Sequence, residues 1–146
     1  DVTIAFQSNL LREQHATLKN LSDYPTDIAA ARTFCFVREI EPLLRVGLIK
    51  GGDLKNALVI YETELSQSGM DYFCDKMGQP HLDATKLGYL SPLNYPNEPA
   101  RHKVLDVIGD LSLLGLRLQG RVIAYKPGHP FNTQCVRRLR NQILSE

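Results

Sequence analysis

Segments with strand periodicity alternate with segments of helical periodicity along most of this chain. Residues 2–7 alternate cleanly and predict a half-buried strand, with residues 14–21 as its hairpin partner. The same patterns predict further strands at the end of 29–36 and over 57–61, 86–91 and 121–125, and helices over 37–47, 66–77, 98–114 and 131–144. This interleaving, together with the hairpin, favours an α+β fold: a two-layer α/β sandwich in which a mixed sheet packs on helices.

The length indicates one domain over residues 1–146, because two ordinary domains need a longer chain. Within it, a Gly-Gly-Asp turn at 51–53 precedes the apolar run 57–61, a short helix and a weaker strand. We therefore expect a small βαβ insert over residues 51–91. The first residue is Asp1 and no signal-peptide pattern follows, which indicates a trimmed or excised chain.

The composition excludes several classes of protein. Hydrophobic residues make up 43% and charged residues 23%, which is typical of a globular domain. The formal charge of +1 argues against a nucleic-acid partner, and no apolar run approaches the roughly 20 residues of a transmembrane segment. Three widely spaced cysteines argue against a disulfide scaffold and favour a reducing, cytoplasmic location.

The helix predicted over 98–114, with Asn97 as its N-cap, carries the most informative side chains. His102 and Asp106 are four residues apart, so a helix places both on one face, and Asp110 continues that face one turn further. An imidazole and a carboxylate at this spacing can act as two zinc ligands, although a catalytic site needs a third protein ligand. The alternative is a solvated helix face with a His–Asp hydrogen bond.

A second histidine, His129, follows a predicted strand at the entrance to the last helix. It can act as a general acid or stabilise a developing negative charge, or it can be a capping or surface histidine. Lys103 and Lys126 can bind an anionic substrate or can be solvated side chains. Phe34 and Phe36 are most simply aromatics of the core or of a cleft.

Four motifs occur in a recognisable order: ARTFCF at 31–36, GGDLxNA at 51–57, NEPARHKxLDxIGDL at 97–111 and AYKxGHxxN at 124–132. By these motifs the chain resembles, over nearly its whole length, the C-terminal half of the UDP-3-O-acyl-N-acetylglucosamine deacetylases. These are the zinc enzymes of lipid A biosynthesis. The extra segment around 78–99 resembles the Bacteroidetes-type forms of the family.

The resemblance implies a zinc-dependent hydrolysis of the acetamide of UDP-3-O-acyl-N-acetylglucosamine. His102 and Asp106 are then two of the three zinc ligands. His129 stabilises the oxyanion or protonates the leaving amine, and Asp110 orients it by a hydrogen bond. In the family, zinc polarises the acetamide carbonyl and activates the attacking water.

The resemblance also implies residues that contact the substrate. Thr33 lines the oxyanion site, and the lysines Lys103 and Lys126 contact the phosphates or the sugar. Phe34 and Phe36 flank the substrate. The insert over 51–91 forms a hydrophobic passage for the acyl chain, and the remaining implied contacts are Ile40, Gly52 and Val59.

The chain departs from the family pattern in one respect. The third zinc ligand of the family is a histidine that follows a glutamate general base, and both belong to the N-terminal half, whereas this chain has no Glu-His dipeptide. We therefore expect two metal ligands, no catalytic base and no activity without the N-terminal half as partner. The rival prediction is a non-catalytic module that binds acyl chains or nucleotide-sugars. A homodimer formed through the exposed domain interface is a further possibility.

Overall fold

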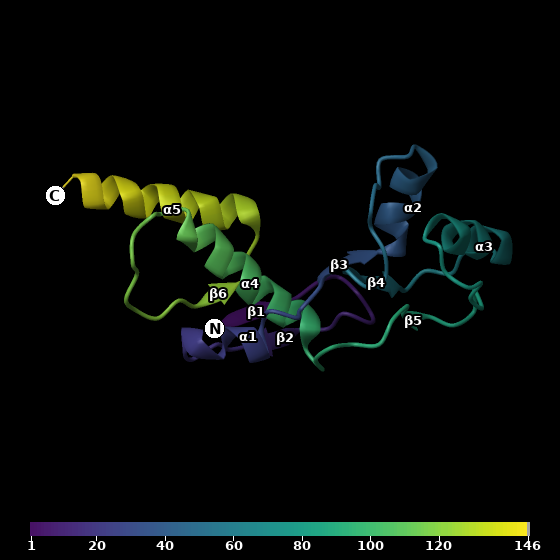
Figure 1. Cartoon of the computed structure of the whole chain (residues 1–146), viewed down its shortest axis with the longest axis horizontal. Coiled ribbons are helices and arrows are strands. Elements are labelled where there is room, and N and C mark those ends of the chain that lie inside the picture. Colours follow the sequence, from purple (N-terminus) through teal and green to yellow (C-terminus); the bar gives the residue numbers. More distant parts are fainter. Residues whose placement is uncertain (146) are drawn as a thin grey trace. The chain divides into compact units, whose positions relative to one another are not determined.

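The computed structural model describes residues 1–145, and they fall into two compact units (Figure 1). The first unit comprises residues 1–7 and 11–31 and the chain from Tyr95 onward. The second comprises residues 8–10 and 32–94.

The first unit contains a three-stranded mixed sheet in the order β2-β1-β6. Strand β1 (Val2–Ile4) is antiparallel to β2 (Gln14–Ala16) and parallel to β6 (Ala124–Tyr125). The hairpin expected at the start of the chain is therefore confirmed. The strand expected over 121–125 is shorter, because its pairing with β1 begins where Ala124 lies opposite Val2.

Two long helices complete the first unit. Helix α4 (Glu98–Ser112) contacts β1 and β2 and buries Ala100, Val104 and Val107, and α5 (His129–Leu144) packs against α4 (Figure 1). A short 3-10 turn η1 (Leu21–Asp23) and α1 (Tyr24–Asp27) follow β2.

Asn97 lies at the expected N-cap position of α4, but its side chain makes other contacts. Its side-chain amide donates to the His15 carbonyl (2.7 Å) and its amide oxygen accepts from Arg101 Nε (2.8 Å), so it makes no cap hydrogen bond. A contact with β2 and one with the next turn of α4 take the place of the cap hydrogen bond that the sequence suggested.

The second unit has its own mixed sheet, in the order β3-β4-β5. The parallel strands β3 (Thr33–Phe36) and β4 (Ala57–Tyr61) are joined through α2 (Val37–Arg45), and α3 (Gln67–Lys76) leads to β5 (Gly88–Tyr89), which is antiparallel to β4. The strand-helix-strand order expected over 51–91 is present. The crossover between parallel strands, however, is β3-α2-β4.

The core of the second unit lies between α2, α3 and the central strand β4. Val59, Tyr61, Met70 and Phe73 are almost completely buried in it. The Tyr61 hydroxyl donates to the Ala84 carbonyl (2.8 Å) and accepts from the Leu65 amide (2.7 Å), so the buried phenol has both of its hydrogen bonds.

The α+β class with mixed sheets on helices is confirmed, with two small sheets in place of one. The single domain over 1–146 stays a prediction. In the described part of the chain, no helix has the length and apolar character needed to cross a membrane.

His81 fastens the segment after α3 to that helix. Its Nε2 lies 2.9 Å from Asp75 Oδ1 and its Nδ1 lies 3.5 Å from Asp71 Oδ1. The hydrogen bond to Asp75 and the charge of Asp71 raise the pKa of His81 above its usual 6.5. A raised folded-state pKa means that protonated His81 stabilises the fold.

We predict that His81→Gln lowers the free energy of unfolding more at about pH 5.5 than at about pH 8.5. The stabilisation by His81 is complete below its unfolded pKa and is lost as the pH rises through the folded pKa. Urea unfolding at the two pH values measures the difference. The same substitution in an Asp71→Asn/Asp75→Asn background is the control and should show no such dependence. An equal loss at both pH values in the parent chain would contradict the prediction.

Candidate functional site

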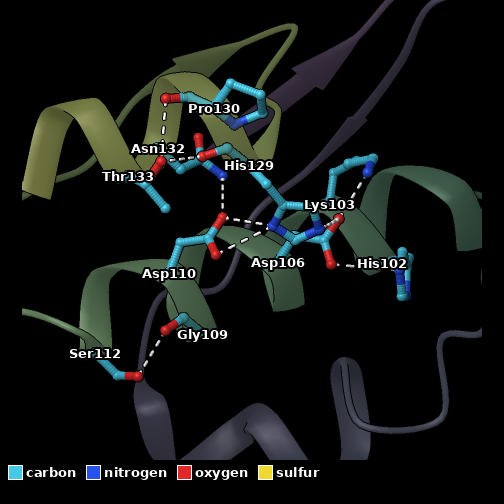
Figure 2. Close-up of polar contacts among 10 residues, drawn as sticks. All are labelled: His102, Lys103, Asp106, Gly109, Asp110, Ser112, His129, Pro130, Asn132 and Thr133. Atoms are coloured by element: carbon cyan, nitrogen blue, oxygen red, sulfur yellow. Dashed lines mark hydrogen bonds and ion pairs between the residues drawn. The ribbon is translucent and has the colours of Figure 1, made fainter.

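Helix α4 presents three of the predicted site residues on successive turns (Figure 2). His102, Asp106 and Asp110 are spaced by four residues, and the close-up shows His102 and Asp106 facing each other, while Asp110 faces the start of α5. The helical spacing therefore brings an imidazole and two carboxylates to one side of the helix, as the sequence predicts.

The backbone beside His102 favours one tautomer. Its Nδ1 lies 3.1 Å from the backbone carbonyl oxygen of Ala31, and because a carbonyl can only accept, a hydrogen bond between them requires the hydrogen on Nδ1. In the neutral ring, Nε2 then carries a lone pair. That nitrogen lies 3.3 Å from Asp106 Oδ1. Two electron-rich atoms therefore face each other, an arrangement that a proton or a metal ion between them stabilises.

Asp106 is the centre of the site. Its side chain is only 8% exposed, and its Oδ2 accepts a hydrogen bond from Lys103 Nζ at 2.6 Å. His129 Nε2 lies 4.0 Å from the same oxygen. The buried carboxylate is thus surrounded by nitrogen atoms of three side chains, which compensates the cost of removing its charge from water.

His129 begins α5 and is fixed by Asp110. Its Nδ1 donates to Asp110 Oδ2 (2.8 Å), and Asn132 Nδ2 donates to the same oxygen (2.8 Å) (Figure 2). The hydrogen bond expected between Asp110 and His129 is therefore present. The imidazole is 63% exposed, so its Nε2 edge is open to a ligand. An oriented, accessible imidazole can transfer a proton or stabilise negative charge.

The donor set of His102 and Asp106 fits part of a zinc site. Two N or O ligands of tetrahedral zinc lie about 3.3–3.5 Å from each other, which matches the 3.3 Å between Nε2 and Oδ1. A backbone carbonyl on the other ring nitrogen is also a common support of a ligating histidine. Among residues 1–145, however, no three His, Cys, Asp or Glu side chains form a group that could hold a metal ion.

The two lysines differ in their surroundings. Lys103 is 18% exposed and its ammonium group is engaged by Asp106, and its contact with a substrate stays a prediction. Lys126 is exposed and adopts a left-handed backbone conformation (φ 50°). Its Nζ lies over the Tyr125 ring, 5.3 Å from the ring centre. It lines a hollow of about 520 Å³ in the first unit.

The other predicted residues belong to the second unit. Thr33 and Gly52 are exposed and Phe34 is half-buried. The remaining three are core residues in this structure, where Phe36 and Ile40 are at least 90% buried and Val59 is fully buried. Their contacts with a substrate stay predictions.

Cys35 lies on β3 beside these residues. Burial, assisted by the charge of Glu39, raises the pKa of its thiol to about 11. The thiol is therefore protonated at neutral pH and offers neither a nucleophile nor a metal ligand.

The sequence reasoning missed two supports of the site. The Ala31 carbonyl gives no sequence signal, because any residue has a carbonyl. Asn132 is three residues after His129 on the same helix, and that spacing could have indicated a shared partner in Asp110.

Comparison with known proteins gives one family. The model of the family UDP-3-O-acyl N-acetylglycosamine deacetylase (LpxC) matches residues 1–76 and 82–141. The chain belongs to this family. The five residues between the two matched segments, 77–81, end at His81.

Curated relatives in the family include longer proteins. A Bacteroides thetaiotaomicron protein named Bifunctional enzyme LpxC/FabZ is 52% identical over 145 residues, which is 98% of this chain and 32% of the relative. A Porphyromonas gingivalis protein of the same name is also 52% identical, over 98% of this chain and 31% of its own length. A Synechocystis UDP-3-O-acyl-N-acetylglucosamine deacetylase is 43% identical over 80% of this chain and 34% of the relative. The chain spans about a third of the length of these relatives.

We predict that Lys103→Met lowers the free energy of unfolding by about 1–3 kcal/mol, because it leaves the buried Asp106 carboxylate without its charged donor. The matched control is Lys86→Met, because the Lys86 side chain is 82% exposed and its Nζ lies 3.9 Å from Asp83 Oδ2. That substitution should cost less than about 0.5 kcal/mol. Urea unfolding in the presence of a chelator measures both. Equal effects would contradict the central place of Asp106.

Proposed function

We propose that this chain is the part of a zinc-dependent UDP-3-O-acyl-N-acetylglucosamine deacetylase that supplies two metal ligands and a proton-transfer group. The full enzyme hydrolyses the acetamide of its substrate in lipid A biosynthesis, in the cytoplasm. The observation that carries the proposal is the His102–Asp106 pair, whose Nε2 and Oδ1 atoms lie 3.3 Å apart, with the Ala31 carbonyl at the other ring nitrogen, in a member of this family. The names of the relatives support the substrate.

His102 Nε2 and Asp106 Oδ1 are the atoms that hold the zinc ion in this proposal. When bound, zinc acts as a Lewis acid toward the acetamide carbonyl and makes water a better nucleophile at neutral pH. The third protein ligand and the general base come from the N-terminal half of the longer polypeptide. The finding that supports this division is that residues 1–145 contain no group of three suitable ligands.

His129 performs the proton chemistry in the proposal. Asp110 accepts its Nδ1 hydrogen, so Nε2 is the atom directed at the substrate. As an imidazolium, it stabilises the oxyanion formed when water adds to the carbonyl. It then gives the Nε2 proton to the amine as the C–N bond breaks, which releases acetate and the free amino sugar.

Further side chains contact the substrate in this proposal. Thr33 lies at the oxyanion, Lys126 contacts the diphosphate or the sugar, and Phe34 and Phe36 flank the sugar. Lys103 reaches the substrate beside Asp106 and balances the charge of that carboxylate. Lys126 is exposed and lines the hollow of the first unit, which supports its role in binding an anion.

The acyl chain binds to the second unit in the proposal, along the insert over 51–91 with Ile40, Gly52 and Val59. The apolar cluster between α2 and α3 supports this assignment. Because Val59 is fully buried there, the acyl chain can reach it only if the two helices separate. Met70 and Met77 at this position are flexible side chains that tolerate such a rearrangement.

The first unit also presents an apolar surface on which we place the N-terminal half. Exposed side chains gather around β6 and the first turn of α5, where Ile123, Tyr125 and Phe131 are each more than 60% exposed. Contiguous apolar surface of this kind marks an interaction site. In the absence of the N-terminal half, the same surface can join two copies of this chain.

We predict that the isolated chain, loaded with zinc, releases no acetate from UDP-3-O-acyl-N-acetylglucosamine, because it lacks a ligand and a base. Addition of the N-terminal half of a relative in trans should restore zinc-dependent release. His102→Ala should abolish the restored activity, whereas His15→Gln, at an exposed position of β2, should keep it. Turnover by the chain alone would contradict the incomplete site. No restoration would favour a binding module.

We predict that the isolated chain self-associates in sedimentation experiments and that Ile123→Lys shifts it toward the monomer, because a charge on the apolar surface opposes its burial. Leu48→Lys is the matched control. Leu48 is 69% exposed and Ile123 is 71% exposed, but Leu48 belongs to the second unit. A monomer at all concentrations would contradict the homodimer.

A further inference from the structure

The carbonyl that fixes the His102 tautomer belongs to a segment with little regular structure. Ala31 follows α1, and its amide donates to the Ile28 carbonyl (2.9 Å) in a turn. Ile28, in the middle of the segment, is fully buried within the first unit. The position of the Ala31 carbonyl therefore depends on what holds the end of α1 in place.

Arg101, the residue before His102, makes that attachment. Its Nη1 donates to the Asp27 carbonyl at the end of α1 (2.5 Å), and its Nε donates to Asn97 Oδ1 (2.8 Å). Its guanidinium group lies 4.6 Å from the centre of the Tyr95 ring. One side chain thus links the start of α4 to the segment that carries Ala31.

The partners of Arg101 extend this attachment. The Tyr95 hydroxyl donates to the Thr26 carbonyl (2.9 Å), one residue before the Arg101 contact. Asn97 Nδ2 donates to the His15 carbonyl on β2 (2.7 Å). Residues 26 and 27 are therefore held by two adjacent hydrogen bonds, one from Tyr95 just before α4 and one from Arg101 on α4, and Asn97 fixes the start of α4 to the sheet.

Only an arginine suits this position. The guanidinium group donates in two directions from one plane and stacks on an aromatic ring through the same plane. A lysine has one ammonium group at the end of a flexible stem, so it can satisfy one of the two acceptors but cannot hold both.

We propose that Arg101 is a positioning residue for His102: by holding the end of α1 on α4, it presents the Ala31 carbonyl to Nδ1 and so turns the lone pair of Nε2 toward Asp106. The proposal rests on the proposed function only in assigning Nε2 to the metal ion. Arg101 itself touches neither the substrate nor the reacting atoms.

If Arg101 only stabilised the fold, its replacement would leave the tautomer of His102 unchanged. The tautomer of His102 therefore tests the positioning role. The ring ¹⁵N chemical shifts of His102 in the metal-free chain report which nitrogen carries the hydrogen. They are measured at about pH 9, where imidazoles are neutral. In the parent chain we expect mainly the Nδ1–H form. In Arg101→Gln and in Arg101→Lys, the ratio of Nδ1–H to Nε2–H should fall at least about fivefold, which is the effect of one hydrogen bond.

Arg140→Gln is the matched control, because Arg140 is exposed on α5, and it should leave the ratio unchanged. If circular dichroism shows that an Arg101 variant does not fold, Tyr95→Phe is used in its place. This substitution removes the hydroxyl donor to the Thr26 carbonyl and keeps the aromatic ring. It should lower the ratio at least about twofold. An unchanged ratio in the folded variants would overturn the role of Arg101.

The outcome separates this inference from the proposed function. The tautomer is measured without metal or substrate, so a failure of the trans experiment would contradict the proposed function and leave the tautomer result intact. An Nε2–H tautomer in the parent chain would instead overturn the inference and the assignment of Nε2 together.

Discussion

The hydrogen bond from His102 Nδ1 to the Ala31 carbonyl is the contact on which the geometry of the site depends. When Nδ1 donates this hydrogen bond, the lone pair of the neutral ring is on Nε2, which faces an oxygen of Asp106. If the ring turned over or exchanged its tautomer, a hydrogen would occupy the place where a metal ion can bind. A backbone acceptor is a stable means of preventing this, because it does not titrate.

Asp106 shows how the same site can be stable without a metal ion. A buried carboxylate is costly unless it is paired, and Lys103 supplies the pairing charge from the same helix. His129 reaches Asp106 from α5, where Asp110 and Asn132 orient its ring. His102 and His129 therefore meet at one carboxylate, although they come from different helices.

The sequence predicted those parts of the site that depend on local geometry. The spacing of His102 and Asp106 sufficed, because helical periodicity alone brings them together. The Asp110–His129 contact spans 19 residues and was expected only from the family resemblance. The contacts of Ala31 and of Asp27 with α4 span more than 70 residues and follow from tertiary packing, which no local pattern encodes. Strand pairing is equally non-local, and the strands accordingly form two sheets where one was expected.

The central claim is that His102 Nε2 and Asp106 form two corners of a zinc site completed by another part of the enzyme. Anomalous diffraction at the zinc edge, on crystals of this chain combined with the N-terminal half, tests it most directly. The account predicts zinc at about 2.0–2.2 Å from Nε2 of His102 and from an oxygen of Asp106, with the remaining protein ligand on the added polypeptide. Zinc bound through Nδ1, or bound away from these two side chains, would contradict it.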